Sequence, residues 1–333
     1  MRVIERLNGA LHELFATDER VLLLGEDVAD PYGGAFGATR GLSDRFPDRV
    51  WSTPISEQAT AGVAAGLALG GDRVVVEVMF GDFITLSFDP IVNFLSKCVT
   101  MYGRRTPMPV VVRCPVGGNR GYGPTHSQHP LKHFLGVPNL SLYELSALHD
   151  PAEQLRRALD SGEPAILFED KVLYTRPVWS PAAEGGLFTA ERLGGAGDWV
   201  RLHTGEEAPD WTVIAPGGLT PRVLPALREA LVEEEVLGEL LVPSRLFPLD
   251  VETVLDRVAA ATRVLVVEEG PAGGGWGGEV ARHLTERLWG RLRHPVRVLQ
   301  PPCAVIPAAP HLERDVLLQE STVHRALLEA ERV

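Results

Sequence analysis

The first candidate for chemistry in this chain is Glu57, an acidic residue between a proline-containing loop and a run of small residues. Pro54, Ile55 and Ser56 precede it, and a stretch rich in Ala and Gly follows as far as Gly66. Two interpretations are open. Ser56 can cap a helix, and Glu57 can be an ordinary first-turn acid that the helix dipole favours. Alternatively, Glu57 lies in a dry site, where burial disfavours its charged form and suits it to share a proton with a bound group.

A second candidate lies in the glycine-rich segment from Gly117 to His129, which follows an apolar run ending at Arg113. In open α/β sheets, binding loops lie at this carboxyl end of a strand. The segment carries His126, and an imidazole titrates near neutral pH, which suits proton transfer or anion binding. A polar turn with an exposed histidine is the alternative interpretation.

Two further patterns favour structure over chemistry. The glycines from Gly270 to Gly278 follow a strand and suggest a dinucleotide site, but no acidic residue closes a following strand about 20 residues on. Tight packing between that strand and the next helix explains these glycines better. Met79, Phe80 and Phe83 are, on pattern alone, ordinary core residues at the end of a buried strand.

The elements that must position these residues alternate between strand and helix. Short apolar runs predict buried parallel strands at 21–24, 74–80, 109–113 and 165–168, with helical segments at 56–69, 83–101 and 151–159. The second half repeats the pattern, with strands at 211–214, 238–242, 263–267 and 296–299 and helices near 221–232, 250–260, 277–289 and 321–331. We therefore expect two three-layer α/β domains, 1–180 with a mainly parallel sheet and 199–333, joined by a linker at 181–198.

Composition argues against several classes of function. Acidic residues outnumber basic ones by 44 to 32, the net charge is -12, and no run rich in Lys and Arg occurs, so we expect no nucleic-acid partner. No window approaches the roughly 20 apolar residues that span a bilayer, and the N-terminus has no signal-peptide pattern. Three widely spaced cysteines fit neither a disulfide framework nor a zinc site. We expect a cytoplasmic globular protein with no membrane partner.

Several ordered motifs give the chain a resemblance to a known family. They are Leu24-Gly25-Glu26-Asp27-Val28, Thr39-Arg40-Gly41-Leu42, Thr53-Pro54-Ile55-Ser56-Glu57, Pro109-Val110-Val111-Val112-Arg113, His126-Ser127-Gln128 and Phe247-Pro248-Leu249-Asp250. Nearly end to end, the chain resembles the β subunit of the E1 component of 2-oxo acid dehydrogenase complexes. That family is transketolase-like and depends on thiamin diphosphate. The resemblance implies a pyrimidine-binding domain followed by a transketolase C-terminal domain.

The resemblance also implies roles for the candidate residues. Glu57 matches the carboxylate that hydrogen-bonds N1′ of the cofactor's aminopyrimidine. A proton shared there favours the imino tautomer, whose 4′ nitrogen can take the thiazolium C2 proton. Ile55, Met79 and Phe83 match positions that pack around the aminopyrimidine. His126 matches the histidine that faces the substrate and the arriving lipoyl arm.

Metal sites are implied as well. A structural potassium ion would be bound mainly by carbonyl oxygens of Val110, Ala158, Leu159, Ser161 and Glu163. Thiamin diphosphate enzymes hold the diphosphate through Mg²⁺ at a Gly-Asp-Gly motif, with an Asn roughly 25 to 30 residues later. This chain has no Gly-Asp-Gly. We therefore expect an α-type partner subunit with that motif to hold Mg²⁺ and the diphosphate, in an α2β2 assembly with a second β chain.

The implied function is oxidative decarboxylation of a 2-oxo acid of the pyruvate or branched-chain type, with acyl transfer to a lipoyl domain of an E2 acyltransferase. Two segments depart from the family: Gly123-Pro124-Thr125-His126, which is closer to transketolase, and residues 140–150. They leave the acyl acceptor and the identity of the acid open. The alternatives are a split transketolase or acyloin-forming transferase, and a non-catalytic subunit that only assembles with a partner.

Overall fold

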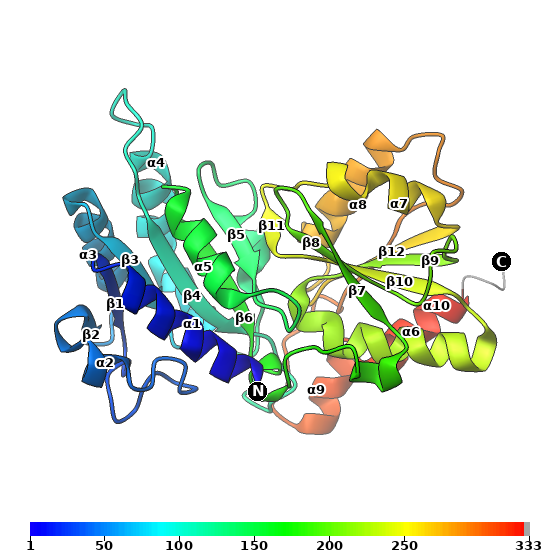
Figure 1. Cartoon of the computed structure of the whole chain (residues 1–333), viewed down its shortest axis with the longest axis horizontal. Coiled ribbons are helices and arrows are strands. Elements are labelled where there is room, and N and C mark those ends of the chain that lie inside the picture. The colour runs from blue at the N-terminus through cyan, green and yellow to red at the C-terminus, as the bar shows by residue number, and fades with distance from the viewer. Residues whose placement is uncertain (330–333) are drawn as a thin grey trace.

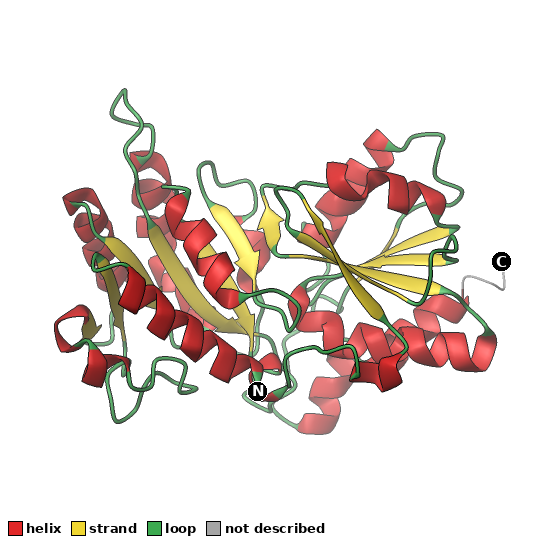
Figure 2. Ribbon diagram, viewed as in Figure 1, coloured by secondary structure: helices red, strands yellow, loops and turns green. Residues whose placement is uncertain are grey.

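The chain forms two α/β domains that lie side by side (Figure 1), in a computed structural model that describes residues 1–329. Each domain has a central sheet with helices on both of its faces (Figure 2). Parallel pairs predominate in both sheets. The expected fold class, two three-layer α/β domains, is therefore confirmed.

The sheet of the first domain has seven strands in the order β11-β5-β6-β4-β3-β1-β2. They are β1 (Val21–Gly25), β2 (Val50–Ser52), β3 (Arg73–Glu77), β4 (Val110–Val116), β5 (Ser141–Glu144), β6 (Ala165–Asp170) and β11 (Arg245–Phe247). Only β11 runs antiparallel to its neighbour, β5. Because β1, β3 and β4 are parallel neighbours, their carboxyl ends meet at one edge of the sheet. The loops that carry the candidate residues leave from this edge.

Helices cover the first sheet in two layers. Helices α1 (Val3–Thr17) and α5 (Pro151–Asp160) pack on one face, and α3 (Glu57–Gly70) with the segment 81–98 packs on the other. In β1, Leu23 joins the first layer and Leu24 the second, as the alternation of side chains along a strand requires. The short helix α2 (Leu42–Arg45) precedes β2. The near-continuous apolar runs are thus explained by a sheet buried on both faces.

The single helix expected at 83–101 is wrong in detail. The chain forms a 3-10 helix at Gly81–Ser87 (η2), a π-helix at Pro90–Leu95 (η3) and the short α4 at Ser96–Cys98. Pro90 has no backbone N–H and cannot continue a preceding regular helix. Only residues 78–80 separate η2 from the end of β3, so η2 lies at the sheet edge that carries the candidate residues.

The sheet of the second domain has the order β13-β12-β9-β10-β8-β7. Its strands are β7 (Thr189–Gly194), β8 (Trp199–His203), β9 (Trp211–Ile214), β10 (Gly238–Pro243), β12 (Arg263–Val267) and β13 (Arg297–Leu299). Its helices are α6 (Thr220–Glu234), α7 (Leu255–Ala260), α8 (Trp276–Arg287), α9 (Pro310–Val316) and α10 (Glu320–Glu329). Helices α6 and α10 cover one face, and α7 and α8 the other (Figure 1). The end of the helix expected at 321–331 lies outside the described residues.

The segment expected to link the domains contains a strand. Within residues 181–198, β7 pairs antiparallel with β8 and forms one edge of the second sheet. Farther along the chain, β11 leaves the second domain and pairs with β5 of the first, with Arg245 opposite Tyr143. The two domains are therefore joined through a shared sheet edge as well as by the chain between them.

Two of the glycines after β12 serve close packing, as predicted. A Cβ atom added to Gly275 would overlap the Glu268 carboxylate, and one added to Gly277 would lie 2.9 Å from Cγ1 of Val298. Gly273, Gly274 and Gly278 have open space at that position. The backbone N–H of Gly277 also donates to the Glu268 carboxylate. In the described part of the chain, no helix has the length and apolar character needed to cross a membrane.

Candidate active site

Glu57 is both a first-turn acid and a buried one. Ser56 caps α3, because its Oγ accepts a hydrogen bond from the N–H of Ala59. Glu57 opens the helix on the side that faces the sheet, and the residue is 9% exposed. Within residues 1–329 its carboxylate has no hydrogen-bond or ion-pair partner. The two interpretations of this residue are therefore compatible, and the unpartnered carboxylate is the feature that capping does not explain.

A second acid lies near Glu57. Glu26 follows the last residue of β1 and is half-buried. Burial raises the pKa of Glu26, and the negative charges of Glu57 and Asp27 raise it further. Sequence reasoning did not count Glu26 as a site residue. The available signal was an acidic side chain directly after a buried parallel strand.

His126 belongs to a cluster of aromatic rings after β3 and β4. Its ring centroid lies 4.7 Å from that of Phe80 and 5.2 Å from that of Phe83, both edge to face. Phe80 also contacts Tyr122 and Phe36, with centroids 5.8 Å and 5.7 Å away. Oγ1 of Thr125 lies 2.9 Å from Nδ1 of His126 and orients its ring. The ring is thus held between the glycine-rich loop and η2.

The other predicted cofactor-binding residues surround this edge of the sheet. Phe83 lies within η2, which packs against α3, the helix that Glu57 opens. Met79 lies between β3 and η2 and is half-buried. Ile55 is 84% exposed, so it projects from the surface beside Glu57 instead of filling the core. The structure brings Phe83 and His126 into contact and connects them to Glu57 through η2. No hydrogen bond joins Glu57 to His126 in the described residues.

A saturated ion-pair network lies at the carboxyl ends of the central strands. Arg113 donates to Oε2 of Glu77 at 2.7 Å and to both carboxylate oxygens of Glu169 at 2.8 and 2.9 Å. The hydroxyl of Tyr174 donates to the same Glu169 carboxylate. Burial opposes the charge of Arg113, but Glu169 and Glu77 raise its pKa. The network ties β3, β4 and β6 together, and it was not predicted from the sequence.

Lys171 is a buried cation beside the aromatic cluster. Its side chain is inaccessible to solvent, and its Nζ lies 5.6 Å from the ring centroid of Phe80. No hydrogen-bond partner for Nζ is found in the described chain. Burial lowers the pKa of Lys171 to about 8, although Asp170 and Asp82 act in the opposite direction.

The residues predicted to bind potassium lie elsewhere. Val110 begins β4, and the others lie in the last turn of α5 or just after it, so the set belongs to the sheet edge opposite Glu57. The hydroxyl of Ser161 donates to the carbonyl of Ala158 at 2.7 Å and to that of Glu163 at 3.3 Å. A potassium ion would have to compete with these bonds. The assignment stays a prediction.

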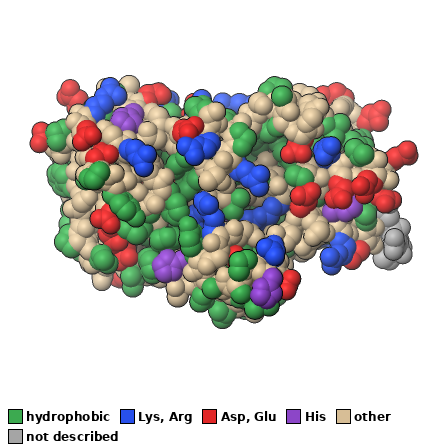
Figure 3. Space-filling view, turned by 90° about the horizontal axis from the view of Figure 1, so that it is seen from below, with side chains coloured by type: hydrophobic (Ala, Val, Ile, Leu, Met, Phe, Trp, Pro, Cys, Tyr) green, Lys and Arg blue, Asp and Glu red, His purple; other side chains and the backbone are tan. Residues whose placement is uncertain are grey.

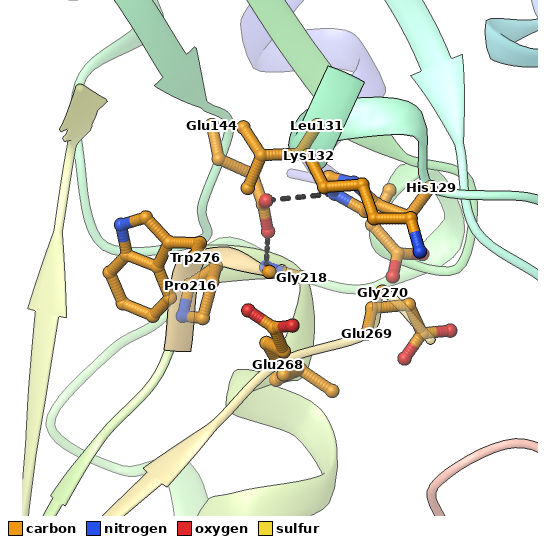
Figure 4. Close-up of a pocket in the computed structure, with 13 residues that line it drawn as sticks. His129, Leu131, Lys132, Glu144, Pro216, Gly218, Glu268, Glu269, Gly270 and Trp276 are labelled. Carbon is orange, nitrogen blue, oxygen red and sulfur yellow. Dashed lines mark hydrogen bonds and ion pairs between the residues drawn. The ribbon is translucent and has the colours of Figure 1, made fainter. Parts of the chain in front are cut away.

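Polar groups of both domains meet in a small pocket between them (Figure 4). One carboxylate oxygen of Glu144 lies 3.0 Å from Nε2 of His129, and the other accepts the N–H of Gly218 at 2.7 Å. Burial would lower the pKa of His129, but the hydrogen bond and charge of Glu144 raise it. Glu268 and Glu269 line the same pocket. These groups are largely paired within the chain, so the pocket joins the domains and is a weaker candidate for catalysis than the Glu57 region.

Comparisons with known proteins agree with this arrangement. Residues 1–177 match the family model described as transketolase, pyrimidine binding domain, and residues 200–323 match transketolase, C-terminal domain. The chain is 33% identical over 298 residues to the pyruvate dehydrogenase E1 component subunit beta of Leifsonia xyli, covering 88% of this chain and 84% of the relative. It is 32% identical to the 3-methyl-2-oxobutanoate dehydrogenase subunit beta of Mycobacterium tuberculosis, covering 89% and 82%.

Two further comparisons extend this picture. The chain is 30% identical to the acetoin:2,6-dichlorophenolindophenol oxidoreductase subunit beta of Cupriavidus necator, covering 92% of this chain and 90% of the relative. Among solved structures, a split-gene transketolase in the form of an inactive β4 tetramer has a TM-score of 0.73 at 20% identity, covering 99% of this chain and 98% of that one. At that identity the structural likeness concerns the fold alone.

The two matched domains define a transketolase-type chain of a thiamin diphosphate-dependent class. Within that class, relatives that match along most of their length include β subunits of pyruvate and 3-methyl-2-oxobutanoate dehydrogenases. This chain belongs to the family of E1 β subunits of thiamin diphosphate-dependent 2-oxo acid dehydrogenases.

Proposed function

We propose that this chain provides Glu57 as the proton-sharing carboxylate of an active site that a separate α-type subunit completes. The observation that carries the proposal is the state of Glu57. Glu57 is 9% exposed, and its carboxylate forms no hydrogen bond or ion pair in the described chain. Its oxygens are therefore available to a hydrogen-bonding group from outside the chain.

The residues around Glu57 fit the aminopyrimidine of thiamin diphosphate. When bound, this cofactor supplies a carbon nucleophile that attacks the 2-oxo group of the substrate. With the cofactor bound, the Glu57 carboxylate would share a proton with a nitrogen of the aminopyrimidine ring. Ile55, exposed beside it, and the half-buried Met79 and Phe83 would provide apolar surface around that ring. A dry site strengthens the hydrogen bond on which the activation depends.

One face of α3 has the small, exposed residues that suit close contact with another chain. Its solvent-exposed positions are Gln58, Ala59, Gly62, Val63, Gly66, Leu69 and Gly70. Nothing lies within 4 Å of a Cβ added at Gly62 or Gly66. Such a small, apolar surface allows the backbone of a partner to approach closely. It begins at Gln58, the residue after Glu57, so a chain that packs there would lie next to the site.

A second surface feature is a pocket that contains more basic than acidic residues. It is lined by Arg2, Arg40 and Arg120 together with Phe36, Tyr174 and Glu5, which pairs with Arg2. Arg40 and Arg120 have no carboxylate partner in the described chain, although the whole chain has a net charge of -12. The N-terminus lies at the lower edge of Figure 1, and the view from that side shows Lys and Arg side chains gathered near the middle of this face (Figure 3). Acidic side chains of an α-type subunit would complement them.

The division of labour follows from the sequence. This chain has no Gly-Asp-Gly, so the α-type subunit carries that motif with its Asn and holds Mg²⁺ and the diphosphate. His126 contacts Phe83 of η2. We assign it to the acceptor side of the reaction, where its imidazole moves a proton as the acyl group passes to a lipoyl domain. A second β chain completes an α2β2 assembly.

The direct test is to co-express this chain with an α-type chain that carries Gly-Asp-Gly and the spaced Asn. The pair should bind thiamin diphosphate with Mg²⁺, release CO₂ from pyruvate or branched-chain 2-oxo acids and reduce an artificial electron acceptor. Either chain alone should bind the cofactor weakly. Tight binding by this chain alone would contradict the shared site, and a fully assembled pair without CO₂ release would favour a non-catalytic subunit.

The acceptor has one competing candidate. The run Gly123-Pro124-Thr125-His126 departs from the family, and it motivates a transferase that joins the two-carbon unit to an aldehyde. Supplying the assembled pair with 2-oxo acid and an aldehyde, without any lipoyl domain, separates the two. Ketol formation at the rate of CO₂ release would establish the transferase, whereas slow ketol formation with fast lipoyl acylation supports the dehydrogenase.

A further inference from the structure

The loop that carries His126 has little structure of its own. Gly117, Asn119, Gly121 and Gly123 all have positive φ angles, of 83°, 61°, 70° and 76°. Within the loop only two backbone hydrogen bonds form, from Gly117 to the carbonyl of Gln128 at 3.1 Å and from His126 to that of Gly123 at 3.3 Å. A segment of this kind depends on outside contacts for a single conformation.

Residues of the second domain supply several of these outside contacts. The N–H of Gly121 donates to Oε2 of Glu313 at 3.0 Å, and Nε2 of Gln319 donates to Oδ1 of Asn119 at 3.0 Å. A Cβ added to Gly118 would lie only 2.3 Å from Cδ1 of Leu317. The loop of the first domain therefore packs closely against α9 and the residues that follow it.

The loop is hydrogen-bonded to two buried carboxylates, one from each domain, at positions before and after His126 in the sequence. Glu313, 2% exposed, holds Gly121 on its N-terminal side. Asp82, 8% exposed, accepts from Nε2 of Gln128 at 2.8 Å on its C-terminal side. The ring between them rests on Phe80 and Phe83, which flank Asp82 in the chain. The carboxylate of Asp82 fixes the loop to η2, and that of Glu313 fixes it to α9.

We propose that Glu313 is a positioning residue by which the second domain fixes His126 for the acceptor half of the reaction. The inference rests on the proposed role of His126. Hydrogen bonds to a charged acceptor are shorter and stronger than neutral ones, and this one connects residues 192 positions apart in the chain. In the described residues, Glu57 shares no hydrogen bond or ion pair with this loop or with α9, so Glu313 acts on the acceptor side alone.

The test uses the assembled complex with its α-type partner and measures two rates. Reduction of an artificial acceptor reports the steps at Glu57, and acylation of a lipoyl domain reports the steps that need His126. Glu313→Ala should lower lipoyl acylation by about 100-fold, since small misplacements of a reacting group have effects of that size. It should leave cofactor binding and reduction of the artificial acceptor close to the wild-type values. Glu313→Gln should recover most of the acylation rate, because its amide oxygen can accept from Gly121.

Hydrogen exchange in the same complex tests the contact without relying on catalysis. Amides in peptides covering 117–129 should exchange faster in Glu313→Ala and at nearly the wild-type rate in Glu313→Gln. Asp315→Ala, an exposed position on the same helix, is the matched control and should change neither exchange nor rates. Unchanged exchange and acylation in Glu313→Ala would overturn the proposal, as would an equal fall in both rates. If the wild-type complex proves inactive, the proposed function fails. Unchanged hydrogen exchange of the loop in Glu313→Ala would separately refute the positioning role of Glu313.

Discussion

Buried carboxylates have opposite environments at two neighbouring places in the first domain. Glu77 and Glu169, on the central strands, are saturated by Arg113 and, for Glu169, by Tyr174. Glu57, at the start of the helix that packs on β3, is also buried but has no partner in the described chain. The first two acids fix the ends of strands, and the third is the one that we propose shares a proton with the cofactor. Burial alone therefore does not identify the functional acid.

The comparison predicts its largest effect on activity at Glu57. Glu57→Gln in the assembled complex should lower turnover by about 10² to 10⁴-fold, because an amide cannot share a proton as a carboxylic acid does. Thermal stability should stay close to that of the wild type, since no intrachain bond is lost. Glu153→Gln, a first-turn acid of α5, is the matched control. Full activity in Glu57→Gln would reduce Glu57 to an ordinary helix-opening acid.

The saturated network predicts the opposite result. Arg113→Met should lower the free energy of unfolding by about 3 to 5 kcal/mol, because it leaves two buried carboxylates without their cation. Urea titration of the chain measures this change. Arg105→Met, which breaks an exposed pair with Glu163, should cost no more than about 1 kcal/mol. Comparable losses for the two variants would mean that the buried network is not a structural support.

Lys171 extends the comparison to an unpartnered cation. Burial lowers its pKa to about 8 from 10.5, so the unfolded chain binds more protons than the folded one between these values. Wild-type stability should therefore rise as the pH increases from about 8 to about 10.5. Lys171→Met should lack this rise and should be more stable at pH 7 by roughly 1 to 3 kcal/mol. Denaturant titrations across this pH range measure the free energy of unfolding, and the exposed Lys97→Met is the control. Identical pH profiles of stability for the wild type and Lys171→Met would show that Lys171 is not desolvated.

The smallest expected effect concerns the residue next to Glu57. Ser56→Ala removes the cap of α3 and should lower the free energy of unfolding by about 1 kcal/mol. Turnover of the assembled complex should change little, because Ser56 contributes a backbone contact and no proton. Ser56→Asp, which can still cap, should restore stability. A loss of turnover as large as that of Glu57→Gln would show that the whole helix start, and not its carboxylate, sets the activity.

The sequence indicated the fold class well because the central strands of both domains are apolar runs covered on both faces. It missed the short strands β2 and β5. It also missed β7, an exposed edge strand with a composition typical of a linker, and β8, which alternates with charged and polar residues. It also missed β11, whose partner β5 lies about 100 residues earlier in the chain. Pairing across domains leaves no local signal.

The site was predictable only in part. The residues around Glu57 left two interpretations open, and the resemblance to a family was needed to favour one of them. Arg113 and Glu77 were overlooked, although each is a charged side chain inside an apolar run and the two lie opposite one another in adjacent strands. Glu313 gave no signal at all, since its partner is a backbone N–H in the other domain.

The pairing of β11 with β5 also bears on how this chain is made. During synthesis the first domain emerges from the ribosome before residue 245 does. The edge of β5 therefore stays unpaired while about 100 further residues are synthesised. An open strand edge is a place where other chains can add. The nascent chain must keep that edge free of neighbours until its own strand arrives. A fragment cut between the domains would expose the same edge permanently, which makes the intact chain the smallest unit expected to stay monodisperse.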